Sequence, residues 1–386
     1  MARIPQHKSL SPLGSAYSVE GDALQQSLQL RCGAVLHNRL AKAAMTERLA
    51  GSDHAPGPRH WRLYTRFAEG SPGLLISGNI MVDRLHLESA GNVALTDERH
   101  RTAFQLWTAA ARSGGSHFWA QISHPGRQTS RFINAHPLSG SDVGLSDRLL
   151  YARPRPLSAE EIEAIIADFV RTAVLAREFG FTGVQIHAAH GYLLSQFLSP
   201  LTNRRTDEWG GVLENRARLL MEIVHRVRAA VGSDFPVSVK INSADFQRGG
   251  FEEVDSLKVI QMLERAGIDL LEISGGNYES PSMFNKGPVR ESTRQREAYF
   301  LDFAARVRKT TRLALMITGG FRSREFVNKT LNSGKVDVIG MARPFLLEHD
   351  FARRFLRKAL AEVPQPALKT GWKTTDLMAE GGWYDL

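Results

Sequence analysis

Eight short apolar segments recur along the chain, and they constrain its fold more than any other feature. Continuous apolar runs of this length are typical of strands that are buried on both faces, as in parallel sheets. We therefore predict eight strands of a parallel sheet. The segments are RLAKAAM 39–45, GLLISGN 73–79, HFWAQI 117–122, GVQIHAA 183–189, VSVKIN 237–242, DLLEIS 269–274, LALMITGG 313–320 and DVIGMAR 337–343.

Helical patterns separate several of these segments. The clearest opens at Ser158, a predicted N-cap, with Glu161 completing a capping box and Gly180 ending the helix. Strand–helix units repeated eight times predict an α/β fold, a (β/α)8 TIM barrel with its chemistry at the C-terminal ends of the strands. The predicted helical stretches are 158–180, 214–232, 253–267 and 324–334.

An open, doubly wound sheet is the competing arrangement, and it calls for a glycine-rich turn after the first strand. The segment AAMTERLAGS at 43–52 lacks that G-x-G-x-x-G pattern. Residues 123–157 are too many for a plain loop, so we expect an active-site excursion after the third strand. We expect one domain over 1–386, with a barrel core at about 35–350 and a C-terminal extension at 351–386.

The composition argues against several classes of protein. A net charge of +9 suits nucleic acid or a membrane surface, but the arginines are scattered rather than clustered with aromatic residues. The single cysteine, Cys32, excludes intrachain disulfides, cysteine-ligated zinc and iron–sulfur clusters. No apolar run reaches the ~18 residues of a membrane span, and the N-terminus MARIPQHKSLSPL lacks the apolar core of a secretion signal. We expect a cytoplasmic protein that binds neither nucleic acid nor membranes.

Polar residues and glycines at the strand ends are the candidate site residues, because these ends converge in a barrel. The fourth segment delivers His187, His190 and Tyr192. Two imidazoles suit either a metal ion or a developing oxyanion, with the phenol as a proton source, and the sequence shows no third metal ligand. The other candidates are Met45, Thr46, Asn79, Gln121, Lys240, Asn242, Gly319, Gly320, Ala342 and Arg343.

The last two segments predict a phosphate site. In many barrels the loops after strands seven and eight bind phosphate through backbone N–H groups and a nearby helix N-terminus. Gly319 and Gly320 allow close approach of the backbone, and Arg343 offers two parallel donors. The alternative is a tight turn followed by a surface arginine.

A long central string carries a resemblance to a known family. GVQIHAAHGYLLSQFLSPLTNRRTDEWGGVLENRARLL at 183–220 resembles the signature of the Old Yellow Enzyme family, the FMN-dependent ene-reductases. Further matches follow in the family's order and cover roughly 35–350 of the chain. They are NRLAKAAMTE, LLISGN, AQISHPGRQ, VSVKINSADF, LEISGGNYE, ITGGFRS and DVIGMARPFL.

The resemblance implies non-covalent FMN, reduced by NADPH or NADH. It places the Thr46 hydroxyl near the flavin C4 carbonyl, Gln121 at the pyrimidine edge and Lys240 near N1 and O2. It implies that Gly320, Ala342 and Arg343 bind the FMN phosphate. The implied cofactor-binding residues are Ala43, Ala44, Met45, Thr46, Asn79, Gln121, Lys240, Gly320, Ala342 and Arg343.

The chain departs from the family pattern at several of these positions. Lys240 replaces an arginine, which keeps the charge and loses the planar fork. Asn79 stands where the family often has alanine or glycine, Ala44 replaces a common proline, and Ala342 replaces a common glycine. Thr46 replaces the cysteine of some relatives, so we expect this chain to lack their redox tuning.

The resemblance also implies the chemistry of the first candidates. His187 and His190 would hold the activating oxygen of an enone or nitroalkene, and Tyr192 would protonate the substrate after hydride transfer from flavin N5. The partner is then a small-molecule substrate, and family likeness suggests a homodimer or higher homo-oligomer. Neither the physiological substrate nor the choice between NADH and NADPH follows from the sequence.

Other functions fit parts of the pattern. Amine dehydrogenases and dienoyl-CoA reductases share the barrel but add an iron–sulfur cluster and further domains, which one cysteine and 386 residues disfavour. A non-catalytic flavin or phosphate carrier would have no use for Tyr192. A metal-dependent barrel hydrolase would use His187 and His190 as ligands.

Overall fold

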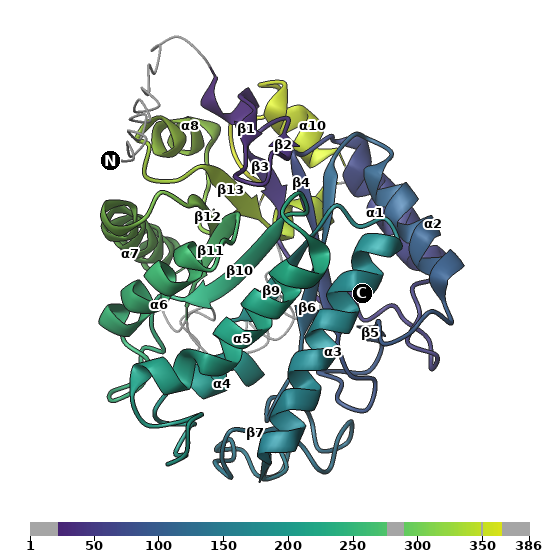
Figure 1. Ribbon diagram of the computed structural model, residues 1–386. Helices are drawn as coiled ribbons and strands as arrows, with labels where there is room; N and C mark the ends of the chain where they lie inside the picture. The colour runs from purple at the N-terminus through teal and green to yellow at the C-terminus, as the bar shows by residue number, and fades with distance from the viewer. Residues whose placement is uncertain (1–21, 276–288, 349, 365–386) are drawn as a thin grey trace, which may run out of the picture.

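The computed structural model describes residues 22–275, 289–348 and 350–364 (Figure 1). Of the predicted C-terminal extension, 365–386 lie outside the described residues. The extension begins with the short helix α10, Phe351–Leu356, which packs against α9, Arg343–Leu347.

Eight parallel strands form a closed barrel, which confirms the predicted fold class. The strand β3 pairs with both β13 and β4, and this double pairing closes the sheet. Each of the eight apolar segments corresponds to one barrel strand, although β4 and β6 extend beyond their segments by two residues and one residue. The strands are β3 Leu40–Lys42, β4 Leu74–Met81, β6 His117–Ser123, β9 Gly183–Ala188, β10 Val237–Asn242, β11 Leu270–Ser274, β12 Ala314–Thr318 and β13 Val338–Met341.

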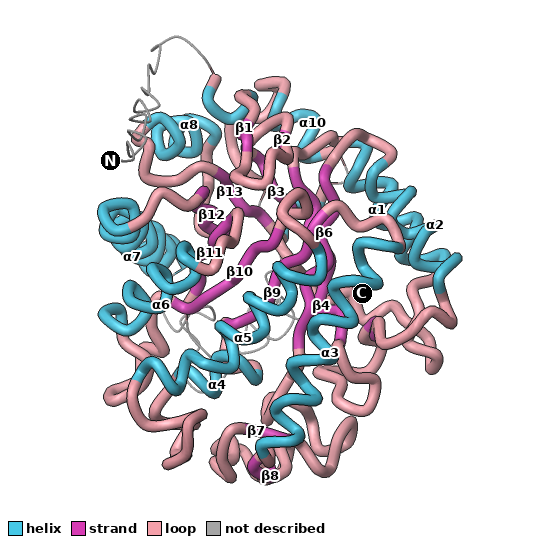
Figure 2. The backbone as a smooth tube through the Cα atoms, viewed as in Figure 1, coloured by secondary structure: helices cyan, strands magenta, loops and turns pink. Residues whose placement is uncertain are grey.

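Helices surround the strands, as Figure 2 shows. Four of them confirm the predicted helical stretches: α3 Ala159–Glu178, α5 Leu213–Val231, α6 Glu253–Arg265 and α8 Arg324–Asn332. The capping box is present, since Glu161 N–H donates to Ser158 Oγ and Ser158 N–H donates to Glu161 Oε2. Among the described residues, six α-helices were not predicted: α1 Pro58–Glu69, α2 Arg101–Arg112, α4 Leu193–Leu198, α7 Val289–Thr310 and the short α9 and α10 given above.

Two apolar cores lie on the two sides of the barrel wall, and the strands β3, β4, β6, β11, β12 and β13 contribute to the inner one. One core fills the bottom of the barrel and is closed by the hairpin of β1 Leu28–Gln29 and β2 Val35–Leu36. The other lies between the barrel wall and the helices. On β3, Ala41 belongs to the inner core and Leu40 to the outer one, so the next residue, Lys42, faces outward.

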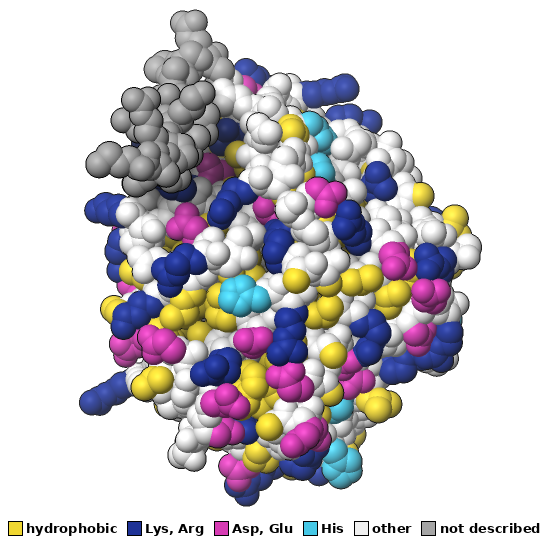
Figure 3. All heavy atoms as spheres, in the orientation of Figure 1, with side chains coloured by type: hydrophobic (Ala, Val, Ile, Leu, Met, Phe, Trp, Pro, Cys, Tyr) yellow, Lys and Arg dark blue, Asp and Glu magenta, His cyan; other side chains and the backbone are white. Residues whose placement is uncertain are grey.

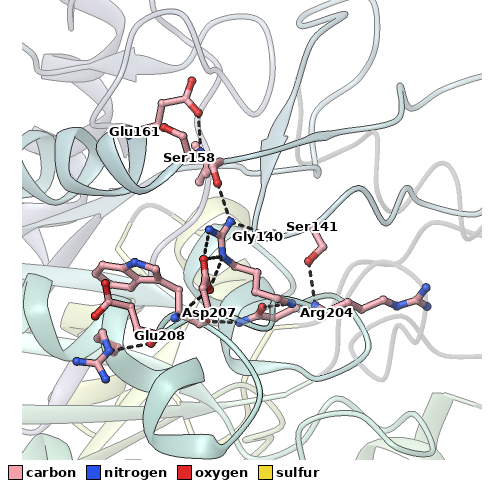
Figure 4. A network of polar contacts seen from close by, with 12 residues as sticks. Gly140, Ser141, Ser158, Glu161, Arg204, Asp207 and Glu208 are labelled. Carbon is pink, nitrogen blue, oxygen red and sulfur yellow. Dashed lines mark hydrogen bonds and ion pairs between the residues drawn. The ribbon is translucent and has the colours of Figure 1, made fainter.

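The predicted excursion follows β6 and carries the short pair of β7 Leu138–Ser139 and β8 Arg155–Pro156. Arg205, from the α4–α5 connection, anchors it by donating to the carbonyls of Gly140 and Leu157 (Figure 4). Arg204 N–H donates to Ser141 Oγ at 2.9 Å. The excursion is therefore fixed to the α4–α5 connection.

Charges of both signs are mixed over the face shown in Figure 3, in line with the scattered arginines of the sequence. Many of these arginines are paired, for example Arg226 with Glu163 and Arg177 with Asp234. Among the described residues, no helix is long and apolar enough to cross a membrane.

Candidate active site

The C-terminal ends of the barrel strands bring the candidate histidines and tyrosine together. The His187 ring lies 5.0 Å from the His190 ring and 4.9 Å from the Tyr192 ring, edge-on in both cases. His187 is the penultimate residue of the buried strand β9, and Tyr192 occupies the N-cap position of α4. Both side chains are buried. The spacing in the sequence therefore becomes one compact group in space.

The contacts of His187 decide which ring nitrogen carries its proton. Ala189 N–H donates to His187 Nδ1 at 3.3 Å. In a neutral imidazole the other nitrogen then bears the hydrogen. Burial, and secondly the charge of Lys240, holds the pKa of His187 well below its usual value. His187 is thus a neutral ring with Nε2–H as a donor.

His190 is held by backbone and side-chain contacts from three other segments. Its N–H donates to Asn242 Oδ1 at 3.1 Å, and its carbonyl accepts from Gln128 Nε2 at 2.7 Å. These contacts support a left-handed backbone with φ of 62°. His190 Nε2 lies 2.6 Å from Ser274 Oγ at the end of β11. Burial, then Lys240 and His187, lowers the pKa of His190 well below its usual value.

A buried polar chain crosses the barrel beneath this group. Lys240 Nζ lies 2.9 Å from Glu272 Oε1. Glu272 also accepts from Gln185 Nε2 at 2.9 Å and from Thr318 Oγ1 at 2.6 Å. Gln121 Nε2 donates to Gln185 Oε1 at 2.7 Å. The candidates Gln121 and Lys240 are therefore linked through residues that the sequence analysis missed.

The segment 43–46, which follows β3, meets a second carboxylate that the analysis missed. Glu88 Oε2 accepts from Thr46 Oγ1 at 3.1 Å and from Asn79 Nδ2 at 2.7 Å. The Thr46 proton is directed to this carboxylate. Ala43 N–H donates to the carbonyl of Met341 at 2.8 Å, which ties the segment to β13.

The ends of β12 and β13 lie side by side, because Thr318 pairs with Gly340. Gly319 and Gly320 both have positive φ, 86° and 87°, and a Cβ built on Gly319 would meet no atom within 4 Å. Arg343 begins α9 directly after the strand. Gly319 N–H already donates to the carbonyl of Gly340 at 3.0 Å, so what suits a phosphate group here is the guanidinium of Arg343 and the open space beside Gly319.

The donor set fits FMN. An ammonium and a carboxamide, from Lys240 and Gln121, lie inside the barrel at the ends of β10 and β6. The phosphate-type end lies two strands further around the barrel, at β12 and β13. The residues present thus suit a flavin ring at the centre and a phosphate at the wall.

A group of potential metal ligands includes neither His187 nor His190. Among the described residues, Asp83, His86 and His124 bring their ligand atoms within 4.8 Å of one another. Gly126 N–H donates to His124 Nδ1 at 3.1 Å, and burial lowers the pKa of His124 to about 3. The neutral ring then carries its proton on Nε2, which cannot ligate a metal. This group gives the metal hypothesis for His187 and His190 no support.

Comparisons with known proteins agree with the resemblance. The NADH:flavin oxidoreductase / NADH oxidase family matches residues 27–361. An NADH-dependent flavin oxidoreductase of Hypocrea jecorina is 38% identical over 343 residues, covering 82% of this chain and 84% of that protein. One from Neonectria is 37% identical over 344 residues, covering 82% of this chain, which spans only 45% of that protein.

Solved structures show the same architecture. The Old Yellow Enzyme homologue of Zymomonas mobilis is 26% identical with a TM-score of 0.74, and the match covers 88% of this chain and 94% of that one.

Proposed function

The chain belongs to the NADH:flavin oxidoreductase / NADH oxidase family, the Old Yellow Enzyme family, and from this premise we propose that it reduces activated C=C bonds. Its cofactor is FMN, and its reductant is a reduced nicotinamide dinucleotide. The observation that carries the proposal is the compact group of His187, His190 and Tyr192 above a buried Lys240.

The reaction adds a hydride at Cβ and a proton at Cα of an enone. Bound FMN supplies the hydride from N5 of its reduced ring. Negative charge develops on the substrate oxygen, and His187 Nε2–H is a preorganised neutral donor for it. Losing one such donor costs about 3–4 kcal/mol in comparable sites.

Ser274 sets the role of His190 in this proposal. When the Ser274 hydroxyl donates to His190 Nε2, at 2.6 Å, the ring proton lies on Nδ1. His190 then offers Nδ1–H as the second donor to the substrate oxygen. Ser274 is a positioning residue, because it acts through the imidazole and its tautomer.

Tyr192 supplies the proton. Its phenol is buried against His187, and a phenol hydroxyl is a weak acid that can protonate an enolate as it forms. Solvent returns the proton after product leaves. Hydride and proton together account for the two hydrogens gained by the alkene.

NADH is the favoured reductant, because both fungal relatives are named as NADH-dependent. The test begins with the visible spectrum of the purified protein and with the flavin released by heat. We expect roughly one FMN per chain, bleaching by NADH without oxygen, and recovery of the spectrum on adding cyclohexenone.

The possible results separate the alternatives. Release of FAD, or of no flavin from folded protein, would refute the FMN site. Bound FMN that neither NADH nor NADPH bleaches would indicate a non-catalytic carrier. FMN that bleaches but is not reoxidised by enones or nitroalkenes would be consistent with an NAD(P)H oxidoreductase. It would refute the proposal that activated alkenes are its substrates.

A further inference from the structure

Lys42 is a buried charge on the side of the barrel wall that faces away from the proposed FMN site. It is the last residue of β3 and its side chain is 0% exposed. The outer core around it includes Tyr64 and Phe67 of α1. The charge therefore lies in an apolar layer, and the alkene chemistry does not use it.

The ammonium of Lys42 has a complete set of partners. Nζ donates to the carbonyl of Ile76 at 2.7 Å and to Tyr64 Oη at 3.0 Å, and it lies 3.8 Å from Glu47 Oε1. The Phe67 ring lies 5.4 Å from Nζ. Such complete pairing is what keeps a lysine charged in an apolar layer.

Glu47 directly follows the 43–46 segment, as Lys42 directly precedes it, and its carboxylate contacts Tyr64 as well. Glu47 Oε1 accepts from the Tyr64 hydroxyl and, at 2.9 Å, from Gly78 N–H. Lys42 and Glu47 thus reach β4 on either side of Ser77, where the pairing of β4 with β6 shifts register. Bulges of this kind re-aim neighbouring side chains.

The approach of the 43–46 segment to β4 is very close at Gly78. A Cβ on Gly78 would lie 2.3 Å from the carbonyl oxygen of Met45 and 2.1 Å from Glu47 Oε2. Any side chain there would push the segment away from β4. The position of the segment is therefore determined by the cluster and by this glycine together.

We propose that Lys42, Glu47 and Tyr64 form a positioning cluster that holds the 43–46 segment and the β4 bulge in the conformation that binds FMN. Buried ion pairs are often replaced by apolar residues without loss of stability, so their main effect can be on geometry. A charge that does not touch the flavin then controls FMN affinity. The inference rests on the proposed function, because it takes the 43–46 segment as part of the FMN site.

The charge of Lys42 is lost within an accessible pH range. Burial lowers the pKa of Lys42 to about 8, with Glu47 opposing the shift. The titratable groups facing it are Glu47 from the segment and Tyr64 from α1, with His60 of α1 near Glu47; β4 contributes the Ile76 carbonyl. The pKa of Tyr64 is raised by burial and by Glu47, so Tyr64 stays protonated. Deprotonation of Lys42 ends its attraction to Glu47.

Stability and FMN affinity should then change in opposite directions. A lysine pKa that is lower in the folded than in the unfolded chain makes its contribution to stability rise with pH between about 8 and 10.5. FMN affinity should fall over the same range, because the cluster loosens. A general loss of fold would lower both.

The experiment measures FMN released from diluted holoenzyme by flavin fluorescence, at pH 7 and pH 9.5, together with thermal unfolding. We expect wild-type protein to release FMN at least tenfold more readily at pH 9.5. Lys42→Met should release it at least tenfold more readily than wild type at pH 7, with no further change at pH 9.5. Lys42→Met/Glu47→Gln, which leaves no unpaired charge, should behave like Lys42→Met.

The matched control is Arg228→Met, which breaks a partly buried pair with Asp269 at the N-terminal ends of β10 and β11. It should lower stability and keep the wild-type affinity and pH dependence. Wild-type FMN retention that is equal at both pH values would refute the inference, as would a pH effect that persists in Lys42→Met. Wild-type protein that binds no FMN would instead refute the proposed function.

Discussion

Lys240 and Glu272 give the sharpest test of the proposed FMN site. Their charged atoms lie 2.9 Å apart, and the two residues are 5% and 0% exposed. Glu272 has two further donors, Gln185 and Thr318, so it remains hydrogen-bonded when Lys240 is replaced. Lys240→Met therefore removes a positive charge and leaves a negative one in the barrel.

The size of the expected change in stability and in flavin reduction potential follows from the distances between the charges. At 2.9 Å and an effective dielectric of about 20, the attraction within the pair is about 6 kcal/mol before desolvation is subtracted. Breaking such a pair usually costs about 3–5 kcal/mol of stability. A unit charge ~4 Å from the flavin contributes at most ~4 kcal/mol at the same dielectric. Because ~30 mV corresponds to about 1.4 kcal/mol for two electrons, the upper limit is ~90 mV.

We expect the flavin reduction potential to fall by tens of millivolts in Lys240→Met, since the remaining charge disfavours electron uptake. Glu272→Gln should raise the potential, and the double variant should lie between the two. Lys240→Arg is the control that keeps the charge. Dye-equilibration titration measures all of them. Potentials that stay unchanged in both single variants, with FMN still bound, would place the pair away from the flavin ring.

Three other outcomes are expected. In stopped-flow experiments, Tyr192→Phe should keep the rate of flavin reduction by NADH within about threefold of wild type and slow flavin reoxidation by cyclohexenone roughly 10²-fold. Equal losses of rate in both half-reactions would show that Tyr192 has a structural role. His187→Ala and His190→Ala should each weaken binding of a para-substituted phenol more than tenfold. In wild type the affinity for the phenol should not change through titration of an imidazole between pH 6 and 8, because the pKa values of His187 and His190 are both well below 6.5. A step in the affinity near pH 6.5 would contradict the neutral state of the two rings. Ser158→Ala should cost about 1 kcal/mol by loss of the cap and lower Tm by about 2 °C, whereas Ser158→Asp should not.

Three of the helices that were not predicted, α1, α4 and α7, show why sequence patterns failed to reveal them. In α1, the buried residues His60, Tyr64, Phe67 and Ala68 follow helical spacing after Pro58, so the signal was present. In α4 every side chain is buried, so no polar face marks it as a helix. In α7 the charged residues are spread along most of its length, and the apolar stripe is weak.

The partners of the site residues show the limit of the sequence more clearly. His187, His190 and Tyr192 are close in the chain, and one strand end suffices to bring them together. Ser274 reaches His190, and Glu272 reaches Gln185 on the same strand as His187, from positions more than 80 residues away in the chain. Glu88 and Tyr64 carry no motif that marks them, and Glu47 ends the matched string NRLAKAAMTE without a role that the string assigns to it.

The sequence by itself determined the eight strands, their order in a barrel and the family, because continuous apolar runs and local motifs are properties of neighbouring residues. Only the tertiary structure decided that Lys240 meets Glu272, that Lys42 faces the outer core, and which nitrogen of His187 carries the proton. The physical reason is the register between strands. A shift of one residue turns a side chain from one face of the barrel wall to the other, and no local pattern records which partner it then meets.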